Sequence, residues 1–426
     1  MKLLLKNAHL YHEHKFEDTD VLIEDGIITA IEREIATQVD ELIDLQGKLL
    51  CHNFLDIHTH LREPGLEYKE TIQTGTLSAL YGGYGTIVAM ANTKPCMDNK
   101  AMLDDLQGRF QEDACVNAYT YSAITKGLMG KELVNMEDNI QSPIVVGFSD
   151  DGRGVQSDEM MAGAMKEAKR LGSIIVAHCE DERELKGGCV HEGTYAKAHQ
   201  LVGINSESEW KQVERDLKLV EEIHNRYHIC HISTKETVAL LKAAREKGLQ
   251  ASGEATPHHL ILTDENIKDC HPNYKMNPPL RSREDHQALI NGLNEGVITV
   301  ISTDHAPHSR EEKNQPIQKA PFGIIGLQHA FPLLYTHLVK KNLVSLETIL
   351  DAMTSGPAKT LGLKAQVAIG EKANLSAFDL NKEFEIKEED LKSKANNTPF
   401  LGWHVFGKIR LNIVNGTLHE MEDENE

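Results

Sequence analysis

Short apolar segments alternate with longer amphipathic segments between residues 54 and 303, and this alternation limits the possible folds of the chain. The apolar segments are typical of buried strands. We expect strands at residues 54–58, 86–91, 116–122, 144–148, 174–178, 228–232, 250–254 and 297–303. Residues 157–171, 207–225 and 235–247 carry apolar side chains at helical spacing. The pattern predicts an α/β fold, a (β/α)8 barrel of the TIM type, with an open doubly wound sheet as the alternative.

Both ends of the chain have a different texture, with short strands and tight turns. Strands are expected at residues 3–10, 21–24 and 27–31, with Asp25-Gly26 as a hairpin turn, and a second antiparallel pair at 42–45 and 48–51. Residues 373–379, 405–409 and 411–414 repeat this texture. Because exposed strand edges need partners, we expect one composite β-sandwich domain from residues 1–50 and 365–419. Residues 51–364 would form the barrel and 420–426 a disordered acidic tail.

Charge and composition exclude several classes of protein. The chain has 45 basic and 65 acidic residues, a formal net charge of −20, which argues against nucleic acid or an anionic membrane as partner. A small anionic substrate stays possible where an arginine and a metal reverse the local field. The longest uncharged stretch, residues 71–93, is expected to be a helix followed by a strand and not a membrane span. With no signal-peptide core and seven scattered cysteines, interpreted as reduced thiols, we expect a cytoplasmic protein.

Polar side chains stand at the ends of five expected strands. His58 and His60 point to the same side of the first strand, because side chains alternate between faces, and two imidazoles form half of a metal site. In a barrel the C-terminal ends of the strands meet at one mouth. The other strands end in SDD (149–151), HCE (178–180), CH (230–231) and TDH (303–305). Taken singly, such residues often bind backbone or cap helices, but together they would suffice for two metal ions.

Four motifs resemble those of one enzyme family. DIHTHLREPG at 56–65 and TDHAPH at 303–308 resemble the two signatures of the dihydroorotases, within the amidohydrolase superfamily. ANTKP at 91–95 and KMNPPLR at 275–281 resemble two further segments in the same chain order. The resemblance implies a barrel with a composite β-domain. It also implies the reversible interconversion of N-carbamoyl-L-aspartate and L-dihydroorotate, the ring-closing step of de novo pyrimidine (UMP) synthesis.

The resemblance also implies a pair of zinc ions per chain. The implied ligands are His58, His60, Asp151, His178, His231 and Asp304. Many relatives bridge their metals with a carboxylated lysine, but VVGFSDDG at 145–152 has none, so the chain is similar to the branch with an aspartate bridge. Asp151 would bridge the ions together with a hydroxide, and Asp150 is the alternative. Asp304 would act as general base and then as general acid.

Several residues are expected to bind the substrate. Arg62, two positions beyond His60, can hold a carboxylate through two hydrogen bonds. The resemblance implies that Asn92 and His308 share this carboxylate, that Asn277 touches the ring amides, and that the backbone of Phe322 and Gly323 faces the substrate. The polar segment 309–322 is expected to be either a lid or a flexible linker. His258 and His259 are assigned to structure, not to metal.

Two alternatives belong to other functional classes. One is another cyclic amidohydrolase, similar to hydantoinase or allantoinase, and the missing lysine together with Arg62, Asn92 and Asn277 argues against it. The other is a non-catalytic subunit that binds aspartate transcarbamoylase, and the complete ligand set argues against that. A homodimer or an association with aspartate transcarbamoylase is compatible with the resemblance.

Overall fold

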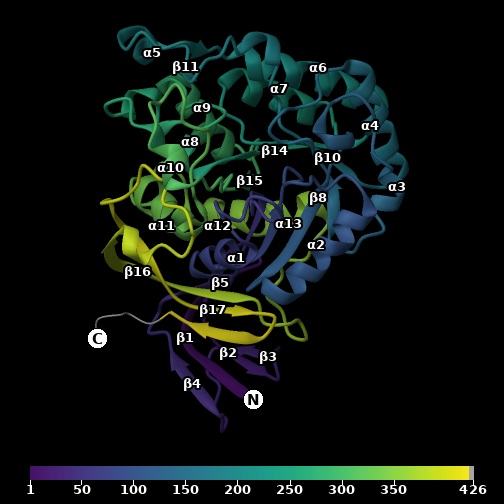
Figure 1. Cartoon of the computed structure of the whole chain (residues 1–426). Helices are drawn as coiled ribbons and strands as arrows, with labels where there is room; N and C mark the ends of the chain where they lie inside the picture. Colours follow the sequence, from purple (N-terminus) through teal and green to yellow (C-terminus); the bar gives the residue numbers. More distant parts are fainter. Residues whose placement is uncertain (422–426) are drawn as a thin grey trace.

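Parallel strands form the centre of the structure, a computed structural model that describes residues 1–421 (Figure 1). They pair in the order β15-β14-β13-β10-β9-β8-β7-β6. The strands are β6 (Phe54–Thr59), β7 (Tyr84–Ala89), β8 (Asn117–Ser122), β9 (Val145–Phe148), β10 (Ile174–Ala177), β13 (Arg226–Ile229), β14 (Ala251–Ala255) and β15 (Val300–Ile301). A parallel bridge between Thr59 and His305 brings the two edges together, and His60 N donates to His305 O at 2.9 Å. The predicted (β/α)8 barrel is confirmed.

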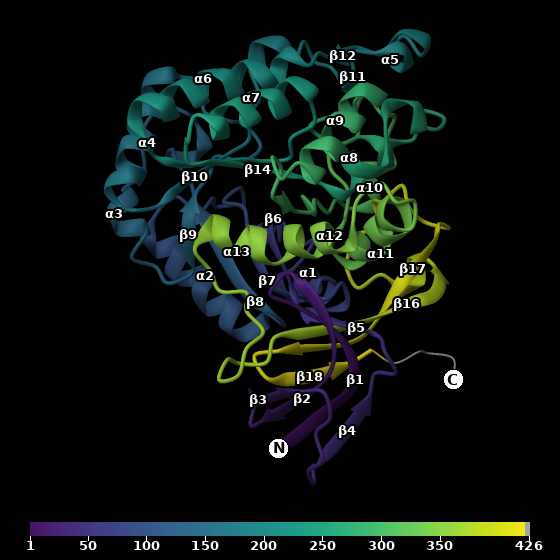
Figure 2. The same ribbon diagram turned by 180° about the vertical axis from the view of Figure 1, so that it is seen from behind.

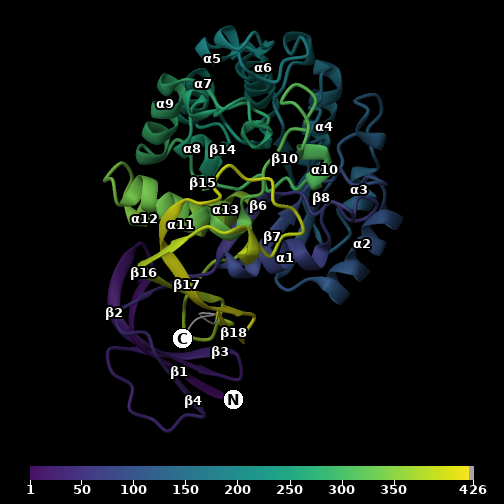
Figure 3. The ribbon, with the colours of Figure 1, turned by 60° about the vertical axis from the view of Figure 1, so that its left-hand side comes forward.

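Helices surround this ring of strands (Figure 3). They are α1 (Ile72–Tyr81), α2 (Lys100–Asp113), α3 (Met136–Asn139), α4 (Asp158–Arg170), α5 (Thr194–Ala198), α6 (Glu207–Ile223), α7 (Lys235–Glu246), α8 (Pro257–Ile261), α9 (Arg283–Asn294), α10 (Arg310–Lys313), α11 (Ala330–Leu334), α12 (Leu346–Met353) and α13 (Ser355–Leu361). Helix α4 shows why they begin where they do: the Ser157 side chain accepts from Met160 N, and acidic residues occupy the first turn, where the helix dipole favours them. No helix in residues 1–421 is long and apolar enough to cross a membrane.

A second sheet contains strands from both ends of the chain, and Figures 1 and 2 show them together below the barrel. Its strands are β1 (Lys2–His12), β2 (Lys15–Glu24), β3 (Ile27–Glu32), β4 (Glu41–Asp44), β5 (Leu49–His52), β16 (Leu375–Glu385), β17 (His404–Val414) and β18 (Thr417–Glu420). They pair in the order β18-β17-β16-β5-β1-β2-β3, with β4 also on β1. Leu5, Leu10, Val21, Leu375 and Ile413 share one buried core, so both chain ends build one unit. The domain limits stay predictions. A separate two-stranded parallel sheet is formed by β11 (Val190–His191) and β12 (Gly203–Ile204), which lie between β10 and α6 in the sequence.

The prediction that residues 42–45 and 48–51 pair with each other was wrong. Strand β4 runs parallel to residues 3–6 of β1, and β5 runs parallel to residues 9–11. Asn7 interrupts the regular geometry of β1 with a φ of 53°. Gln46-Gly47, between β4 and β5, also has positive φ values and lies opposite this irregularity. Because Gly47 N donates to Asn7 O at 2.7 Å, the two irregularities match and the chain continues straight instead of turning back.

The C-terminal strands also differ from the prediction. The expected strands at 405–409 and 411–414 form one strand, β17. Asn415-Gly416 then turns the chain into β18, which was not predicted. Glu420 therefore lies in a strand and Met421 is buried, so the prediction of disorder was wrong for these two residues. The rest of that predicted tail, residues 422–426, lies outside the described residues.

An aromatic cluster joins the two sheets. Phe54 opens β6, Phe378 lies on β16 and Phe331 on α11, and all three are buried. Their ring centroids are 4.5 to 5.3 Å apart, within the range of favourable aromatic pairs. The second sheet is thus anchored to the start of the first barrel strand, at the opposite end of β6 from His58.

Candidate metal centre

The strand ends bring together all six side chains that were predicted to bind metal. They form two groups of possible ligands, His58 with His60 and Asp304, and Asp151 with His178 and His231. His60 Nε2 lies 3.0 Å and His58 Nε2 lies 3.4 Å from Asp304 Oδ1. In the other group His178 Nδ1 lies 3.4 Å and His231 Nε2 lies 3.8 Å from Asp151 Oδ1. All six residues are buried.

Asp151 lies between the two groups, whereas Asp150 does not. Asp151 Oδ1 is 3.5 Å from His58 Nε2, and its Oδ2 is 3.5 Å from His60 Nε2. Asp150 Oδ1 instead accepts hydrogen bonds from the backbone N–H groups of Ile124 at 2.7 Å and Thr125 at 3.0 Å. The carboxylate of Asp150 therefore holds the loop after β8, and that of Asp151 faces both groups of histidines.

The chemistry of the cluster fits bound cations. His58 Nε2 and Asp151 Oδ1 are buried, and neither has a hydrogen-bond partner. Buried polar atoms without partners are costly, and this pair faces the space that both ligand groups share. Imidazole nitrogen and carboxylate oxygen are common ligands of zinc and of other divalent first-row transition metals. These residues would hold one or two divalent cations.

The carboxylates of the centre are held in their ionised form. Burial alone would raise the pKa of Asp304, but the charge of His58 and the hydrogen bond with His60 lower it to about 2. Burial would likewise raise the pKa of Asp151, yet His58, His178 and His231 hold it well below its ordinary value. Burial would lower the pKa of His178, but the neighbouring carboxylates of Asp151 and Glu180 raise it to about 10. The anionic groups thus attract positive charge to the site.

Three non-glycine residues of the site have left-handed backbone conformations. The φ values are 64° for Arg62, 30° for His231 and 49° for Asp304. Such conformations are unfavourable for residues with a Cβ atom and persist where the surrounding structure enforces them. They turn the chain sharply just past the ends of β6, β13 and β15, which directs these side chains into the mouth of the barrel.

Two buried glutamates support the histidines, a role that was not predicted from the sequence. Glu254, at the end of β14, has Oε1 2.5 Å from His58 Nδ1 and Oε2 3.1 Å from His228 Nε2. Glu180 has Oε2 3.5 Å from His178 Nε2. A carboxylate on the second ring nitrogen orients a metal-binding histidine and selects its tautomer. The strand-end position that identified the ligands could also have identified Glu254.

Cys230 also lies beside the possible metal ligands. Its Sγ belongs to a third group of possible ligands, with His58 and Asp151. Burial raises the pKa of this thiol well above its ordinary value, which keeps it neutral. Cys179, by contrast, lies near Tyr227 Oη at 3.3 Å and belongs to none of the three groups. His259 does not face the metal centre with a free nitrogen at this position either, since its Nε2 donates a hydrogen bond to Pro278 O at 2.9 Å.

A cavity of about 220 Å³ opens over the centre. Its wall includes five of the six possible ligands and every residue predicted to bind substrate: Arg62, Asn92, Asn277, His308, Phe322 and Gly323. Arg62 Nε donates to Pro307 O at 3.0 Å, which fixes the guanidinium at the wall. The cavity therefore presents a fixed cation beside the ligand cluster.

His308 is an uncharged hydrogen-bonding group in this wall. Burial, together with the cations Arg62, Lys69 and Lys313, lowers its pKa to about 2. Its Nε2–H donates to Phe322 O at 2.7 Å, and its Nδ1 accepts from Lys69 Nζ at 3.3 Å. One tautomer of the neutral ring satisfies both contacts. Lys69 was not predicted, although it adds a second cation to this side.

The two predicted asparagines contact protein groups of the centre. Asn92 Oδ1 lies 3.0 Å from His60 Nδ1, and its Nδ2 lies 3.3 Å from Asp151 Oδ2. Asn277 Nδ2 donates to Glu180 Oε1 at 2.7 Å. Both side chains line the cavity, and each also orients a possible metal ligand or its supporting carboxylate.

The segment 309–323 is fastened to the barrel by a buried lysine. Ser309 caps the short helix α10, which ends at Lys313. Lys313 is only 3% exposed, and its Nζ donates to Gly323 O at 2.9 Å, Pro321 O at 3.0 Å and Lys275 O at 3.3 Å. Asn397 Nδ2 also donates to Gly323 O at 3.0 Å. These bonds hold the backbone of the predicted substrate-binding segment against the cavity.

This chain is similar to known proteins over nearly its whole length. A family model described as "Dihydro-orotase-like" matches residues 47–237. A protein named Dihydroorotase from Bacillus cereus (strain AH820) is 46% identical over 420 residues, which is 98% of both chains. The Dihydroorotase of Bacillus cytotoxicus shows the same identity and the same coverage.

Solved structures with the same fold carry a different name. The L-Hydantoinase (Dihydropyrimidinase) from Arthrobacter aurescens superposes with a TM-score of 0.90 at 25% identity, over 99% of this chain and 96% of that chain. The dihydropyrimidinase from Brevibacillus agri NCHU1002 gives a TM-score of 0.84 at 22% identity, over 98% and 95%. This second likeness concerns the fold alone.

Proposed function

The chain belongs to the dihydroorotase family, and we propose that the cluster at the barrel mouth is the centre at which it interconverts N-carbamoyl-L-aspartate and L-dihydroorotate. The observation that supports this most strongly is the coincidence of two ligand groups and a fixed arginine in one cavity. A cyclic amide with a free carboxylate needs both kinds of group. The reaction is the ring-closing step of pyrimidine synthesis.

We propose that the six residues hold two divalent cations, zinc being the expected metal. His58, His60 and Asp304 would bind one ion, His178 and His231 the other, and Asp151 would bridge them. When bound, such ions polarise a carbonyl group and make a water molecule nucleophilic at neutral pH. The chain's own contribution is to orient the histidine ligands, through the network around Glu254 and Glu180.

Asp304 is the proposed proton carrier. Its Oδ1 is engaged by His58 and His60, and its carboxylate is ionised at neutral pH. In ring opening this carboxylate would accept a proton from the attacking water and deliver it to the departing ring nitrogen. In ring closure it would accept the proton of the ureido nitrogen as that nitrogen attacks the side-chain carboxyl carbon. It would then deliver this proton to the departing carboxyl oxygen, which leaves as hydroxide when its bond to the carbon breaks. One carboxylate thus serves as base and then as acid.

Arg62 is the proposed partner of the substrate's free carboxylate. Its guanidinium lies on the same wall as Asn92 and His308. Because the His308 ring is uncharged, it does not repel the positive charge of Arg62. The backbone of Phe322 and Gly323 lines the other side. Asn277 reaches the cavity from the loop that follows α8, where a ring amide would lie.

The alternatives from the sequence have less support. The hydantoinases share the fold at 25% identity or less, whereas the proteins named Dihydroorotase share 46% of residues over nearly the entire chain. A non-catalytic subunit would not need two complete groups of ligands. The cytoplasmic location, the homodimer and the association with aspartate transcarbamoylase stay predictions.

The test is a two-way assay on zinc-loaded protein, combined with metal analysis. We expect cyclisation of N-carbamoyl-L-aspartate under mildly acidic conditions and hydrolysis of L-dihydroorotate at higher pH, because cyclisation consumes a proton. Asp304→Asn should keep the fold and lose both activities. A fully metal-loaded protein that turns over neither compound would contradict the proposal, as would full activity in Asp304→Asn.

A further inference from the structure

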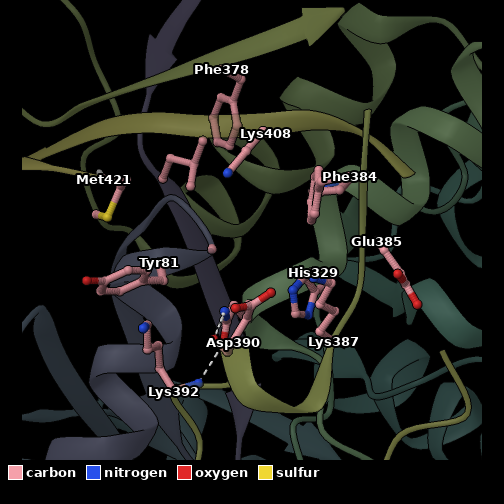
Figure 4. Close-up of a pocket in the computed structure, with 14 residues that line it drawn as sticks. Tyr81, His329, Phe378, Phe384, Glu385, Lys387, Asp390, Lys392, Lys408 and Met421 are labelled. Atoms are coloured by element: carbon pink, nitrogen blue, oxygen red, sulfur yellow. Dashed lines mark hydrogen bonds between the residues drawn. The ribbon is translucent and has the colours of Figure 1, made fainter. Parts of the chain in front are cut away.

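A second cavity lies between the barrel and the second sheet, away from the metal ligands (Figure 4). Its volume is about 450 Å³, within the range of roughly 300–1,000 Å³ that small-molecule sites occupy. Its walls come from the end of α1, the helical turn Leu327–His329, α11, strands β16 and β17, and the loop after β16. None of its lining residues lines the cavity over the metal centre. Junctions between structural units are common places for ligand sites.

Aromatic rings form much of this wall. Figure 4 shows Tyr81 and Phe384 on opposite sides of the cavity, with Phe378 above them and His329 below Phe384. His329 and Phe384 have ring centroids 6.3 Å apart. Burial lowers the pKa of His329 to about 4, so its ring is uncharged at neutral pH. A flat ring entering the cavity would meet aromatic faces on more than one side.

Charged groups of both signs line the cavity, and Lys392 is the one placed to meet an anion. The others are Lys387, Lys408, Glu385 and Asp390. Lys392 Nζ lies over the Tyr81 ring, 4.6 Å from its centroid. Among residues 1–421, Lys392 forms no ion pair with a carboxylate. Its ammonium group is therefore placed beside an aromatic face with its charge available to a ligand.

The loop that carries Lys392 is held in place by a side chain of the wall. Gln328 Oε1 accepts from Lys392 N at 2.8 Å, and Gln328 Nε2 donates to Asp390 O at 2.8 Å. Next to it, Lys394 N donates to Glu70 Oε1 at 3.0 Å. Hydrogen bonds thus hold the backbone on both sides of Lys392, so less conformational entropy of this loop is lost when a ligand binds.

We propose that this cavity binds a flat aromatic anion, with its ring against Tyr81 and its phosphate or carboxylate at Lys392. The ring supplies stacking and the anion supplies the charge, and each is insufficient alone. Phosphate and carboxylate share this chemistry, so a nucleoside monophosphate and an aromatic carboxylate are the two sources to distinguish.

Calorimetric titration of the full-length, zinc-loaded protein tests the proposal with AMP, UMP, benzoate, adenosine and inorganic phosphate. We expect at least one of the first three to bind with one site per chain. Adenosine and inorganic phosphate, the separate halves of AMP, should bind at least tenfold more weakly than that ligand. Phosphate and carboxylate sources are distinguished by which of the three binds. Tyr81→Leu and Lys392→Gln should each weaken binding at least tenfold.

The controls separate this cavity from other anion sites. Lys382→Gln changes an exposed lysine of β16, the strand that carries Phe378 and Phe384, and should leave binding unchanged. Arg62→Gln removes the cation of the metal-centre cavity and should also leave it unchanged. The proposal is wrong if none of the three aromatic anions binds at millimolar concentration. It is equally wrong if binding survives Tyr81→Leu and Lys392→Gln, or is lost in Arg62→Gln alone.

Discussion

Glu254 Oε1 lies 2.5 Å from His58 Nδ1, and both side chains are fully buried. This contact fixes the ring so that Nδ1 faces Glu254 and Nε2 faces Asp151 and Asp304. Because Glu254 Oε1 also accepts from His231 N at 3.1 Å, one carboxylate orients elements of both ligand groups. The metal centre is therefore built from a supporting shell as much as from its ligands.

Glu254→Gln should weaken metal binding, because an amide cannot hold the His58 proton as a carboxylate does. We expect a loss of roughly 10- to 100-fold in zinc affinity, measured by competition with a chelator. Glu246→Gln, an exposed carboxylate on α7, is the matched control. Unchanged zinc affinity in a folded Glu254→Gln protein would show that the contact has no orienting role.

Asp151→Asn and Asp150→Asn should differ in metal content. Asp151 faces both ligand groups, so its variant should retain about one ion instead of two by mass spectrometry. Asp150 binds the backbone of Ile124 and Thr125, so its variant should retain both ions and lose about 1–3 kcal/mol of stability. The reverse pattern would assign the bridge to Asp150.

Arg62→Gln should impair use of N-carbamoyl-L-aspartate mainly through substrate binding. Loss of one charge-assisted contact costs about 1.5–3 kcal/mol, roughly a tenfold to hundredfold fall in kcat/KM, with metal content unchanged. Arg33→Gln alters an exposed arginine and controls for net charge. Steady-state kinetics in which Arg62→Gln matches the wild type would remove Arg62 from the substrate site.

Lys313→Met should alter how stability depends on pH. Burial, with the nearby charge of Lys275, lowers the pKa of Lys313 to about 7 in the folded chain, against 10.5 as the ordinary value. Between these two values the unfolded chain binds more protons, so this group makes the folded state more stable as pH rises. From pH 7 to pH 9 the wild type should gain on the order of 2 kcal/mol relative to Lys313→Met.

Urea unfolding of both proteins at the two pH values measures this difference. Lys319→Met, an exposed lysine of the same segment, should follow the wild type at both pH values. A constant gap between wild type and Lys313→Met would mean that Lys313 titrates in the folded chain as it does in water.

The order of elements was predictable because it depends on local patterns. Apolar runs and helical spacing located the barrel strands and the helices α4, α6 and α7 within a few residues. The strand-end positions of His58, His178 and Asp304 followed, since a parallel barrel brings its strand ends to one mouth. The Asp25-Gly26 turn was also predictable, as both residues have positive φ.

Tertiary structure alone decided what depends on residues distant in the chain. The sequence favoured Asp151 as the bridge and left Asp150 as the alternative, and the structure separates them because the backbone of Ile124 and Thr125 engages Asp150. The supporting role of Glu254 arises from a partner 196 residues away. Residue type and spacing determined which chemistry the barrel mouth would hold. Long-range contacts decided which atom of each side chain faces it, because they set backbone angles and hydrogen-bond partners that no local pattern encodes.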